Sequence, residues 1–466
     1  MGTYGYTFLG FIAVAVLLYL AAPARWRQGL VVLFGLLYAA SYGPGTLLPL
    51  LALFLANHLL AGRIAASRPA RAWLVAAIAA DLGCLALFKY ADLVLASVPA
   101  LNQAAPARWV AGLPEFAGLS YLTFSVLAYQ IDLWRGQTSP APARPLAAYM
   151  LFFPKFVAGP IVRPAELMTQ LRTPEVALNA ERFERGLLLI AAGMAKKFLV
   201  ADQLAGAIGR GFKDIEGLSF LASWLVMWAY AVQIYMDFSG YTDIARGLAR
   251  LFGFELPRNF KSPYVAGNAS EFWSRWHMSL SRWFRDYVYI PLGGSRMGSA
   301  RTYANLVVTM SLCGLWHGAA WTFVAWGAYH GLLMAATHLW RRIPESVLPR
   351  RVRASRGYRA AAVLLTFQLV TVGWVFFRAG SFRAAGKMLS AMAGLHGLGL
   401  SRGPIKASDA ALIAAALAGA WIFDRVNLAR PLARVPWPVR VAAATAIVFF
   451  TLIARVPGGE FIYGGF

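Results

Sequence analysis

Two consecutive segments of very different polarity dominate the sequence: FELPRNFKSPYVAGNASEFWSRWHMSLSRWFRDYVYIPLGGSR (residues 254–296) and LVVTMSLCGLWHGAAWTFVAWGAYHG (residues 306–331). The first has too many ionisable side chains to be an ordinary membrane span, because unpaired charges are costly in the bilayer interior. These side chains are Arg275, His277, Arg282, Arg285 and Asp286. The second is apolar enough to enter a bilayer and contains His317 and His330. The chain is therefore organised around a polar helix followed by a histidine-bearing span.

The polar segment predicts one amphipathic helix lying in the plane of the membrane. Asn268 can cap its start, Glu271 can complete a capping box, and Pro291 with Gly293 can end it. On a helical wheel, Trp273, Trp276, Leu280, Trp283 and Tyr287 form one stripe, and Arg275, Ser279, Arg282 and Asp286 form the opposite one. We expect the aromatic stripe to face lipid or protein core and the cationic stripe to face water or head groups. His277 lies at the edge of the aromatic stripe, where it can face a buried cavity.

The composition is that of a polytopic membrane protein. The 466 residues are 59% hydrophobic and only 14% charged. The net charge of +24 is scattered between apolar stretches, which basic cytoplasmic loops explain more simply than a nucleic-acid groove. We therefore expect no nucleic-acid partner. The two cysteines lie in apolar stretches and indicate neither a disulfide framework nor a metal site.

Hydropathy and periodicity predict an all-α integral membrane protein with roughly 10–13 transmembrane helices in addition to re-entrant and in-plane helices. We treat residues 1–466 as one membrane-embedded domain with a central part at 119–379. The expected N-terminal spans, within residues 1–111, are at about 6–22, 28–42, 45–62 and 72–97; later spans are at about 359–377, 408–424 and 438–455, the last two within residues 400–466. No convincing signal-peptide cleavage site follows the first span, so we expect it to be retained.

The segment LFFPKFVAGPIVR, residues 151–163, is apolar but interrupted by Pro154, Gly159 and Pro160. This pattern predicts a re-entrant or kinked element buried in protein, because lipid cannot satisfy a broken backbone. Lys155 could hold an anionic donor group there, or it could extend its ammonium group to the lipid head groups.

The segment YMDFSGYTDIARG, residues 235–247, places Asp237 and Asp243 on either side of Gly240. It predicts a break in the helix with an aspartate cap. A metal site is an alternative, but no further ligand lies at suitable spacing, so no metal is expected. A third interpretation is that Asp237 orients a catalytic histidine.

The position of His317 makes it the strongest candidate for a functional residue. If the basic segments before Thr302 and after Trp340 both face the cytoplasm, the chain crosses the membrane and returns between them. A helix starting at Arg301 would place His317 roughly 24 Å along a hydrocarbon core about 30 Å thick. A histidine at that depth is a functional candidate, although a hydrogen-bonded packing histidine is the alternative.

A buried histidine suits acyl transfer from a thioester to an alcohol. That reaction needs a base to remove the hydroxyl proton, donors to stabilise the oxyanion, and exclusion of water. Imidazole has a suitable pKa, and burial excludes water. The sequence has no Cys–His nucleophile arrangement, no P-loop and no Rossmann fingerprint. Direct attack by the alcohol and a transient acyl-histidine both remain open.

The run EFWSRWHMSLSRWFRDYVYIPLGG, followed by LWHG and WGAYHG, resembles the membrane-bound O-acyltransferases, in particular the bacterial branch that O-acetylates polysaccharides such as alginate. Four more segments fit: FFPKFVAGPIVR (152–163), GMAKKFLVADQLA (193–205), YMDFSGYTDIARG (235–247) and VGWVFFRA (372–379). The resemblance spans roughly Leu119–Ala379 and implies the fold of that family.

The resemblance also implies roles for individual residues. His317, in LWHG, is expected to be catalytic, and His277, in RWH, is expected to assist it. Substrate- or donor-binding candidates are Asp237, Arg275, Arg282 and Lys155. Gly318 is expected to permit close approach of substrate to His317, whereas His330 is expected to be a packing residue.

The implied reaction moves an acyl group, expected to be acetyl, from a cytoplasmic thioester across the bacterial inner membrane. The acceptor is a hydroxyl of a cell-surface or secreted polysaccharide, reached directly or through a periplasmic acetylation partner. The donor is acetyl-CoA or an acyl carrier, with D-alanyl on a carrier protein as an alternative, and no cofactor is expected to stay bound. Membrane lipids and the polysaccharide are the other expected partners.

Two other classes of function compete with this hypothesis. A transporter or flippase without covalent chemistry would also contain intramembrane histidines and broken helices. Such proteins are commonly built from two related halves, and the histidine-bearing segments have no counterpart in the N-terminal half. A structural scaffold would leave His317 dispensable.

Overall fold

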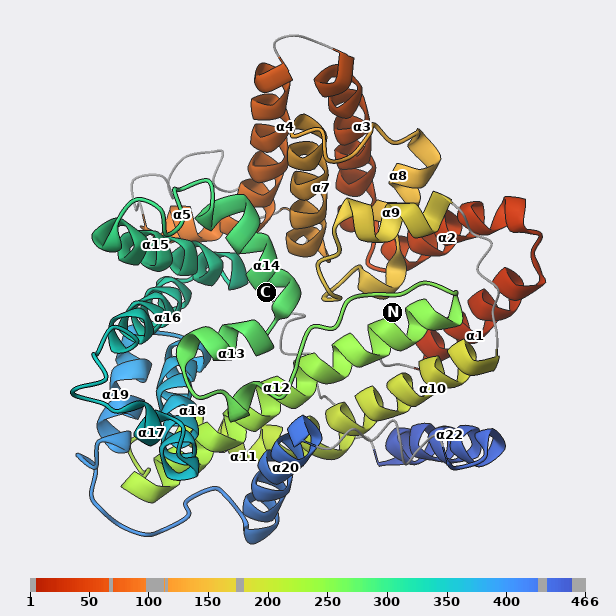
Figure 1. Cartoon of the computed structure of the whole chain (residues 1–466). Coiled ribbons are helices and arrows are strands. Elements are labelled where there is room, and N and C mark those ends of the chain that lie inside the picture. The colour runs from red at the N-terminus through yellow and green to blue at the C-terminus, as the bar shows by residue number, and fades with distance from the viewer. Residues whose placement is uncertain are drawn as a thin grey trace. The chain divides into compact units, whose positions relative to one another are not determined.

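The computed structural model describes residues 6–66, 70–97, 113, 116–172, 180–425 and 434–454. Throughout these residues the regular secondary structure is helical, as expected (Figure 1). The chain packs as two units, Met1–Ile190 with Ala245–Pro257, and Ala191–Ile244 with Arg258–Phe466. The predicted single domain and its central part at 119–379 stay predictions.

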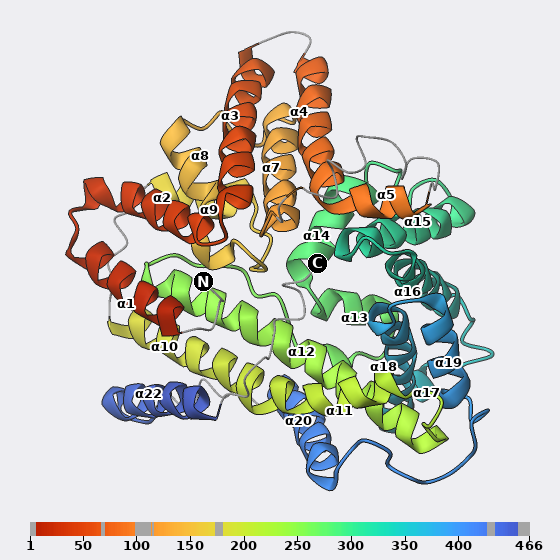
Figure 2. The same ribbon diagram turned by 180° about the vertical axis from the view of Figure 1, so that it is seen from behind.

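The first unit is a set of apolar helices around an aromatic core. Its helices are α1 (Tyr6–Ala21), α2 (Ala24–Ala40), α3 (Pro44–Ala66), α4 (Ala70–Leu85), a π-helix (Ala86–Tyr90), α5 (Ala91–Ser97), α7 (Leu119–Trp134), α8 (Ala143–Met150), α9 (Pro164–Arg172) and most of α10 (Ala180–Met194). Helices α3, α4 and α7 lie side by side in Figures 1 and 2. In the core, the Phe252 ring packs edge-on against Tyr19 and Phe153, with ring centroids 5.0 and 5.5 Å away.

The interrupted segment after α8 is irregular, as the sequence predicts. It contains a single 3₁₀ turn, Phe153–Lys155, and no further regular element before α9. Phe152, Phe153 and Phe156 are all buried, so protein surrounds the broken backbone.

The second unit carries the histidines. Its helices are a π-helix (Ala195–Ala201), α11 (Asp202–Lys213), most of α12 (Phe220–Leu251), a 3₁₀ turn (Pro263–Val265), α13 (Ala269–Arg275), α14 (Met278–Phe284), a second π-helix (Arg285–Tyr289), α15 (Ser299–His317), α16 (Trp321–Trp340), α17 (Arg350–Arg353), α18 (Arg356–Arg378), α19 (Phe382–Met392), α20 (Ala407–Arg425) and α22 (Trp437–Ile453). Helices α15 and α16 form an antiparallel hairpin (Figure 2).

The predicted break at Gly240 is wrong. Helix α12 passes through this residue without interruption. A Cβ at Gly240 would lie 2.7 Å from the carbonyl oxygen of Gly193, and a Cβ at Gly193 would lie 2.4 Å from that of Gly240. These glycines therefore allow close contact between two helices, which a single sequence does not distinguish from a helix end.

Three helical stretches among the described residues are both long and apolar enough to cross a membrane: Pro44–Ala66, Ala70–Leu95 and Arg356–Arg378. Shorter apolar helices cover Thr7–Ala21, Ala407–Ile422 and Trp437–Ile453. Every span predicted at the two ends of the chain thus coincides with a helix. The number of membrane passes stays a prediction.

Candidate active site

The predicted in-plane helix is two helices, because the backbone turns sharply at its centre. Asn268 caps α13 by accepting a hydrogen bond from the Glu271 N–H at 2.9 Å, and the Glu271 carboxylate accepts one from the Gly267 N–H at 2.9 Å. The capping is therefore confirmed, but the helix ends at Arg275. Trp276 is extended, and His277 adopts the left-handed region with φ 40°. The prediction of one continuous helix from Asn268 to Pro291 is wrong.

Hydrogen bonds to the preceding segment explain this turn. The Lys261 N–H donates to the Arg275 carbonyl at 2.9 Å, and the Met278 N–H donates to the Asn259 carbonyl at 2.9 Å. Both groups would bond within the helix if it continued. Residues other than glycine rarely have positive φ, so such strain is maintained only where the surrounding structure requires it. Here it directs the imidazole of His277 into the protein.

His277 is fully buried, and one amide holds its ring. The His277 Nδ1 lies 3.2 Å from Asn259 Oδ1. The same oxygen accepts hydrogen bonds from the Ser279 N–H at 3.0 Å and the Ser279 hydroxyl at 2.9 Å. Burial lowers the pKa of His277 to about 3, so the ring is neutral near neutral pH.

His317 is the last residue of α15, at the point where the chain turns back into α16. Its side chain is 1% exposed and is surrounded by aromatic rings. Ring-centroid distances from His317 are 4.9 Å to Trp316, 5.0 Å to Trp326 and 5.3 Å to Phe377. Trp316, Trp326 and Phe377 thus surround the imidazole.

The two histidines meet in this aromatic enclosure. The ring centroids of His277 and His317 are 6.4 Å apart. Trp316 contacts both rings, and Phe238 of α12 packs 4.7 Å from His277. Two buried imidazoles in apolar surroundings can exchange or position protons while water is excluded. The fold therefore brings together the two histidines that the sequence singles out.

Gly318 has a role different from the predicted one. A Cβ at this position would lie 2.1 Å from the Phe323 ring. Its missing side chain therefore leaves room for Phe323, and this space is not open to substrate.

His330 is a third buried histidine in the same cluster. The Trp273 indole N–H donates to His330 Nδ1 at 3.3 Å, which ties α13 to α16. Trp326 packs between His317 and His330, with centroids 5.0 and 5.1 Å away. The contacts agree with the predicted packing role.

The predicted donor-binding residues are dispersed. Arg275 bonds the carboxylate of Glu271 at 3.0 Å, and Arg282 is half-buried on α14. Asp237 is buried and pairs with Lys197 at 2.9 Å; Lys197 also pairs with Asp202 at 2.9 Å. That Asp237 orients a histidine stays a prediction. Asn259, which the sequence did not single out, lies within hydrogen-bond distance of His277.

Lys155 belongs to the first unit. Its ammonium group is buried 4.7 Å from the centre of the Tyr149 ring and 3.4 Å from the Ser125 hydroxyl. No carboxylate pairs with it among the residues that the structure describes. It does not extend to the surface, which excludes the snorkelling alternative.

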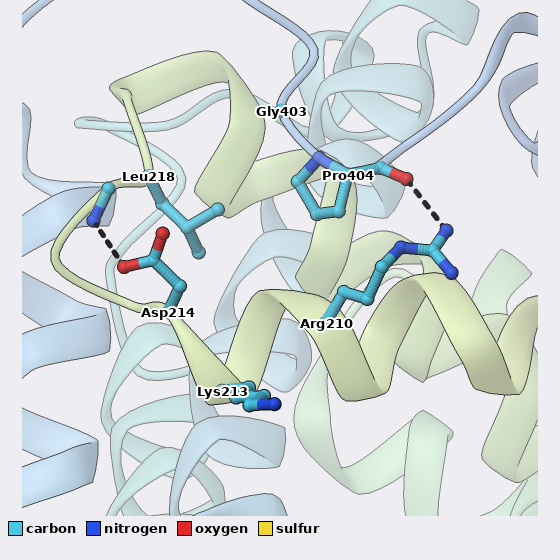
Figure 3. A pocket seen from close by; sticks show the side chains of 7 residues that line it. Arg210, Lys213, Asp214, Leu218, Gly403 and Pro404 are labelled. Atoms are coloured by element: carbon cyan, nitrogen blue, oxygen red, sulfur yellow. Dashed lines mark hydrogen bonds between the residues drawn. The ribbon is translucent and has the colours of Figure 1, made fainter.

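An open pocket of about 570 Å³ lies elsewhere in the second unit, between the end of α11 and the segment at Gly403 and Pro404 (Figure 3). Arg210 donates to the Pro404 carbonyl at 3.3 Å across it. Its lining includes none of the predicted site residues. In the described parts of the chain, no group of three or more His, Cys, Asp or Glu side chains is arranged to hold a metal ion.

Comparison with known proteins places this arrangement in a family. A sequence model of the membrane-bound O-acyltransferase family matches residues 116–371. The chain is 36% identical to a probable alginate O-acetylase of Pseudomonas aeruginosa over 82% of its length and 72% of that protein. It is 32% identical to a peptidoglycan O-acetyltransferase of Helicobacter pylori over 86% of its length and 80% of that protein. A teichoic acid D-alanyltransferase of Bacillus subtilis is 28% identical over 61% of the chain and 74% of that protein.

The chain belongs to the membrane-bound O-acyltransferase family. It is an integral membrane protein and an O-acyltransferase. The matched residues contain the buried histidines His277, His317 and His330. Membership of this family favours the enzyme over the transporter and scaffold hypotheses.

Proposed function

We propose that this enzyme transfers an acetyl group from a thioester donor to hydroxyls of a bacterial cell-surface or secreted polysaccharide. The relatives named for alginate and peptidoglycan O-acetylation support the acetyl group and the glycan acceptor, since both match more than four fifths of the chain. The observation that carries the proposal is the pair of buried histidines with ring centroids 6.4 Å apart.

His317 is the general base in the proposed reaction. The acceptor hydroxyl gives its proton to an imidazole nitrogen of His317 while its oxygen bonds to the thioester carbonyl carbon. The tetrahedral intermediate then collapses, the C–S bond breaks, and the leaving thiolate takes the proton from the imidazolium. The aromatic enclosure excludes water, which would otherwise hydrolyse the thioester.

His277 assists as a neutral hydrogen-bonding group. Its ring remains uncharged near pH 7, so a ring nitrogen can accept a hydrogen bond from substrate. Arg275, Arg282, Lys155 and Asp237 are proposed contacts to the donor or acceptor.

We place the enzyme in the bacterial inner membrane, with the donor, acetyl-CoA or an acyl carrier, on the cytoplasmic side. The acceptor lies on the periplasmic side and is reached directly or through a partner acetylation protein. The helix α15 that carries His317 supports this route, because a residue at the end of a 19-residue helix lies far from the start of the helix.

The test is the ester content of the host polysaccharide, measured by base-labile acetyl release. Wild type, a deletion strain, and the deletion strain carrying His317→Ala are compared at equal membrane abundance. His338→Ala is the matched control, because His338 is half-exposed near the end of α16. We expect the deletion to abolish the esters, His338→Ala to restore them and His317→Ala to fail. Restoration by His317→Ala would exclude its role as the base.

A further inference from the structure

The side-chain oxygen of Asn259 lies within hydrogen-bond distance of three atoms. Its Oδ1 lies 3.0 Å from the Ser279 nitrogen, 2.9 Å from the Ser279 hydroxyl and 3.2 Å from His277 Nδ1. The backbone N–H of Ser279 can only donate, so the amide atom facing it must be the oxygen. If the amide were flipped, its NH₂ group would face the Ser279 N–H, and two donors would then be in contact.

This contact determines the tautomer of His277. A carbonyl oxygen only accepts hydrogen bonds, so His277 Nδ1 must carry the proton in order to bond to it. In a neutral ring the lone pair then lies on Nε2. An acceptor atom is thereby presented on the side of the ring that faces away from Asn259.

The surroundings of Asn259 hold the amide in this orientation. The residue is 0% exposed, and its main-chain carbonyl accepts the Met278 N–H at 2.9 Å. The side-chain and main-chain bonds of Asn259 thus hold three consecutive residues, His277, Met278 and Ser279. Its Nδ2 has no hydrogen-bond partner among the described residues. A buried donor without a partner costs about 1–3 kcal/mol, which the contacts to Oδ1 must offset.

We propose that Asn259 is a positioning residue for acyl transfer, which holds His277 in the Nδ1–H tautomer so that Nε2 accepts a hydrogen bond from a substrate O–H or N–H. This inference rests on the proposed function through His277. Asn259 supplies the oxygen, and the turn at Trp276 and His277 brings the ring to it. The backbone N–H of Ser279, which no side-chain substitution removes, fixes the orientation of the amide.

The test combines a tautomer measurement with kinetics on the full-length protein in lipid. In ¹⁵N-histidine magic-angle-spinning spectra, the His277 signal is assigned by its loss in His277→Gln. We expect the wild type to show the Nδ1–H form and Asn259→Leu to lose it. Transfer to a soluble oligosaccharide acceptor should fall about tenfold or more in Asn259→Leu. Asn259→Asp keeps an acceptor at the same place and should retain both the Nδ1 proton and most of the transfer rate.

Ser279→Ala is the control, because it removes one donor to Asn259 Oδ1 and leaves the other two. It should behave like the wild type. An Nε2–H form in the wild type, or an unchanged tautomer and rate in Asn259→Leu, would overturn the proposal. If Asn259→Leu does not fold, an Asn259→Asp variant with the Nε2–H form overturns it instead. A wild-type rate of acyl transfer in His277→Gln would show that His277 has no part in the proposed reaction. The tautomer of His277 in the wild type and in Asn259→Leu would still show whether Asn259 holds the ring.

Discussion

Gly327 lies where α16 comes closest to α15, and we expect Gly327→Ala to inactivate the enzyme. A Cβ at this position would lie 2.1 Å from the Met310 carbonyl oxygen and 2.9 Å from the Ser311 Cα. Both obstacles are backbone atoms of the neighbouring helix, so no rotamer change can relieve the clash. An ordinary contact begins at 3.4 Å, and the helices must therefore separate locally by about 1.3 Å.

The separation would reach the histidines directly. Trp326, the residue before Gly327, packs against His317 and His330. A misplacement of about 1 Å in a catalytic group can lower a rate by about 100-fold. We expect a loss of that size in acyl transfer, together with about 1–3 kcal/mol of destabilisation from overpacking.

The assay is acyl transfer by purified protein in proteoliposomes, with thermal unfolding measured on the same samples. Gly386→Ala is the control, because Gly386 lies inside α19 and a Cβ there meets no atom within 4 Å. We expect the control to keep full activity. Wild-type activity in a folded Gly327→Ala protein would show that His317 tolerates movement of α16, and the argument from close packing would fail.

Three further predictions concern buried and exposed charges. Lys197→Met should destabilise the protein by about 3–5 kcal/mol, because it leaves the buried carboxylates of Asp202 and Asp237 without their shared cation. Lys196→Met is the control and should destabilise the protein less, because Lys196 forms a partly exposed ion pair with Asp243. Equal losses of stability in thermal unfolding would contradict this prediction. Lys155→Met should leave the unfolding temperature unchanged, because no carboxylate partner is described for Lys155. The same substitution should raise the KM for the thioester donor. An unchanged KM would exclude donor binding by Lys155. Lys387→Ala removes an exposed pair with Glu216 and should leave the unfolding temperature unchanged; a clear decrease would show that this pair is structural.

Sequence patterns predicted the features that depend on local periodicity. Apolar runs located the helices at both ends of the chain, and the Asn268 and Glu271 pattern located the start of α13. These features follow from neighbours within one or two turns. The helical wheel placed Trp273 and Trp283 on a face toward lipid or protein core, and both side chains are buried in the protein, because each half of the broken helix keeps its own 3.6-residue period.

Features that depend on distant partners could not be predicted in this way. Gly240 resembles a helix end in sequence, and only the approach of Gly193 shows that it is a contact point. The turn at His277 depends on the main-chain groups of Asn259 and Lys261, which lie more than a dozen residues before it. Wheel analysis assumes a continuous helix, so it could not show that the ring of His277 turns away from the helix face.

The same limitation explains why Asn259 was missed. A carboxylate is the usual partner sought for a catalytic histidine, and Asp237 was the nearest candidate in an unusual motif. Lys197 occupies that carboxylate at 2.9 Å. A neutral amide has a different consequence from a carboxylate, because it sets the tautomer without stabilising the imidazolium. His277 can then remain neutral near pH 7, as a hydrogen-bonding group beside the proposed base His317. The choice of an amide as hydrogen-bonding partner thus suits His277 to a positioning role in the proposed reaction.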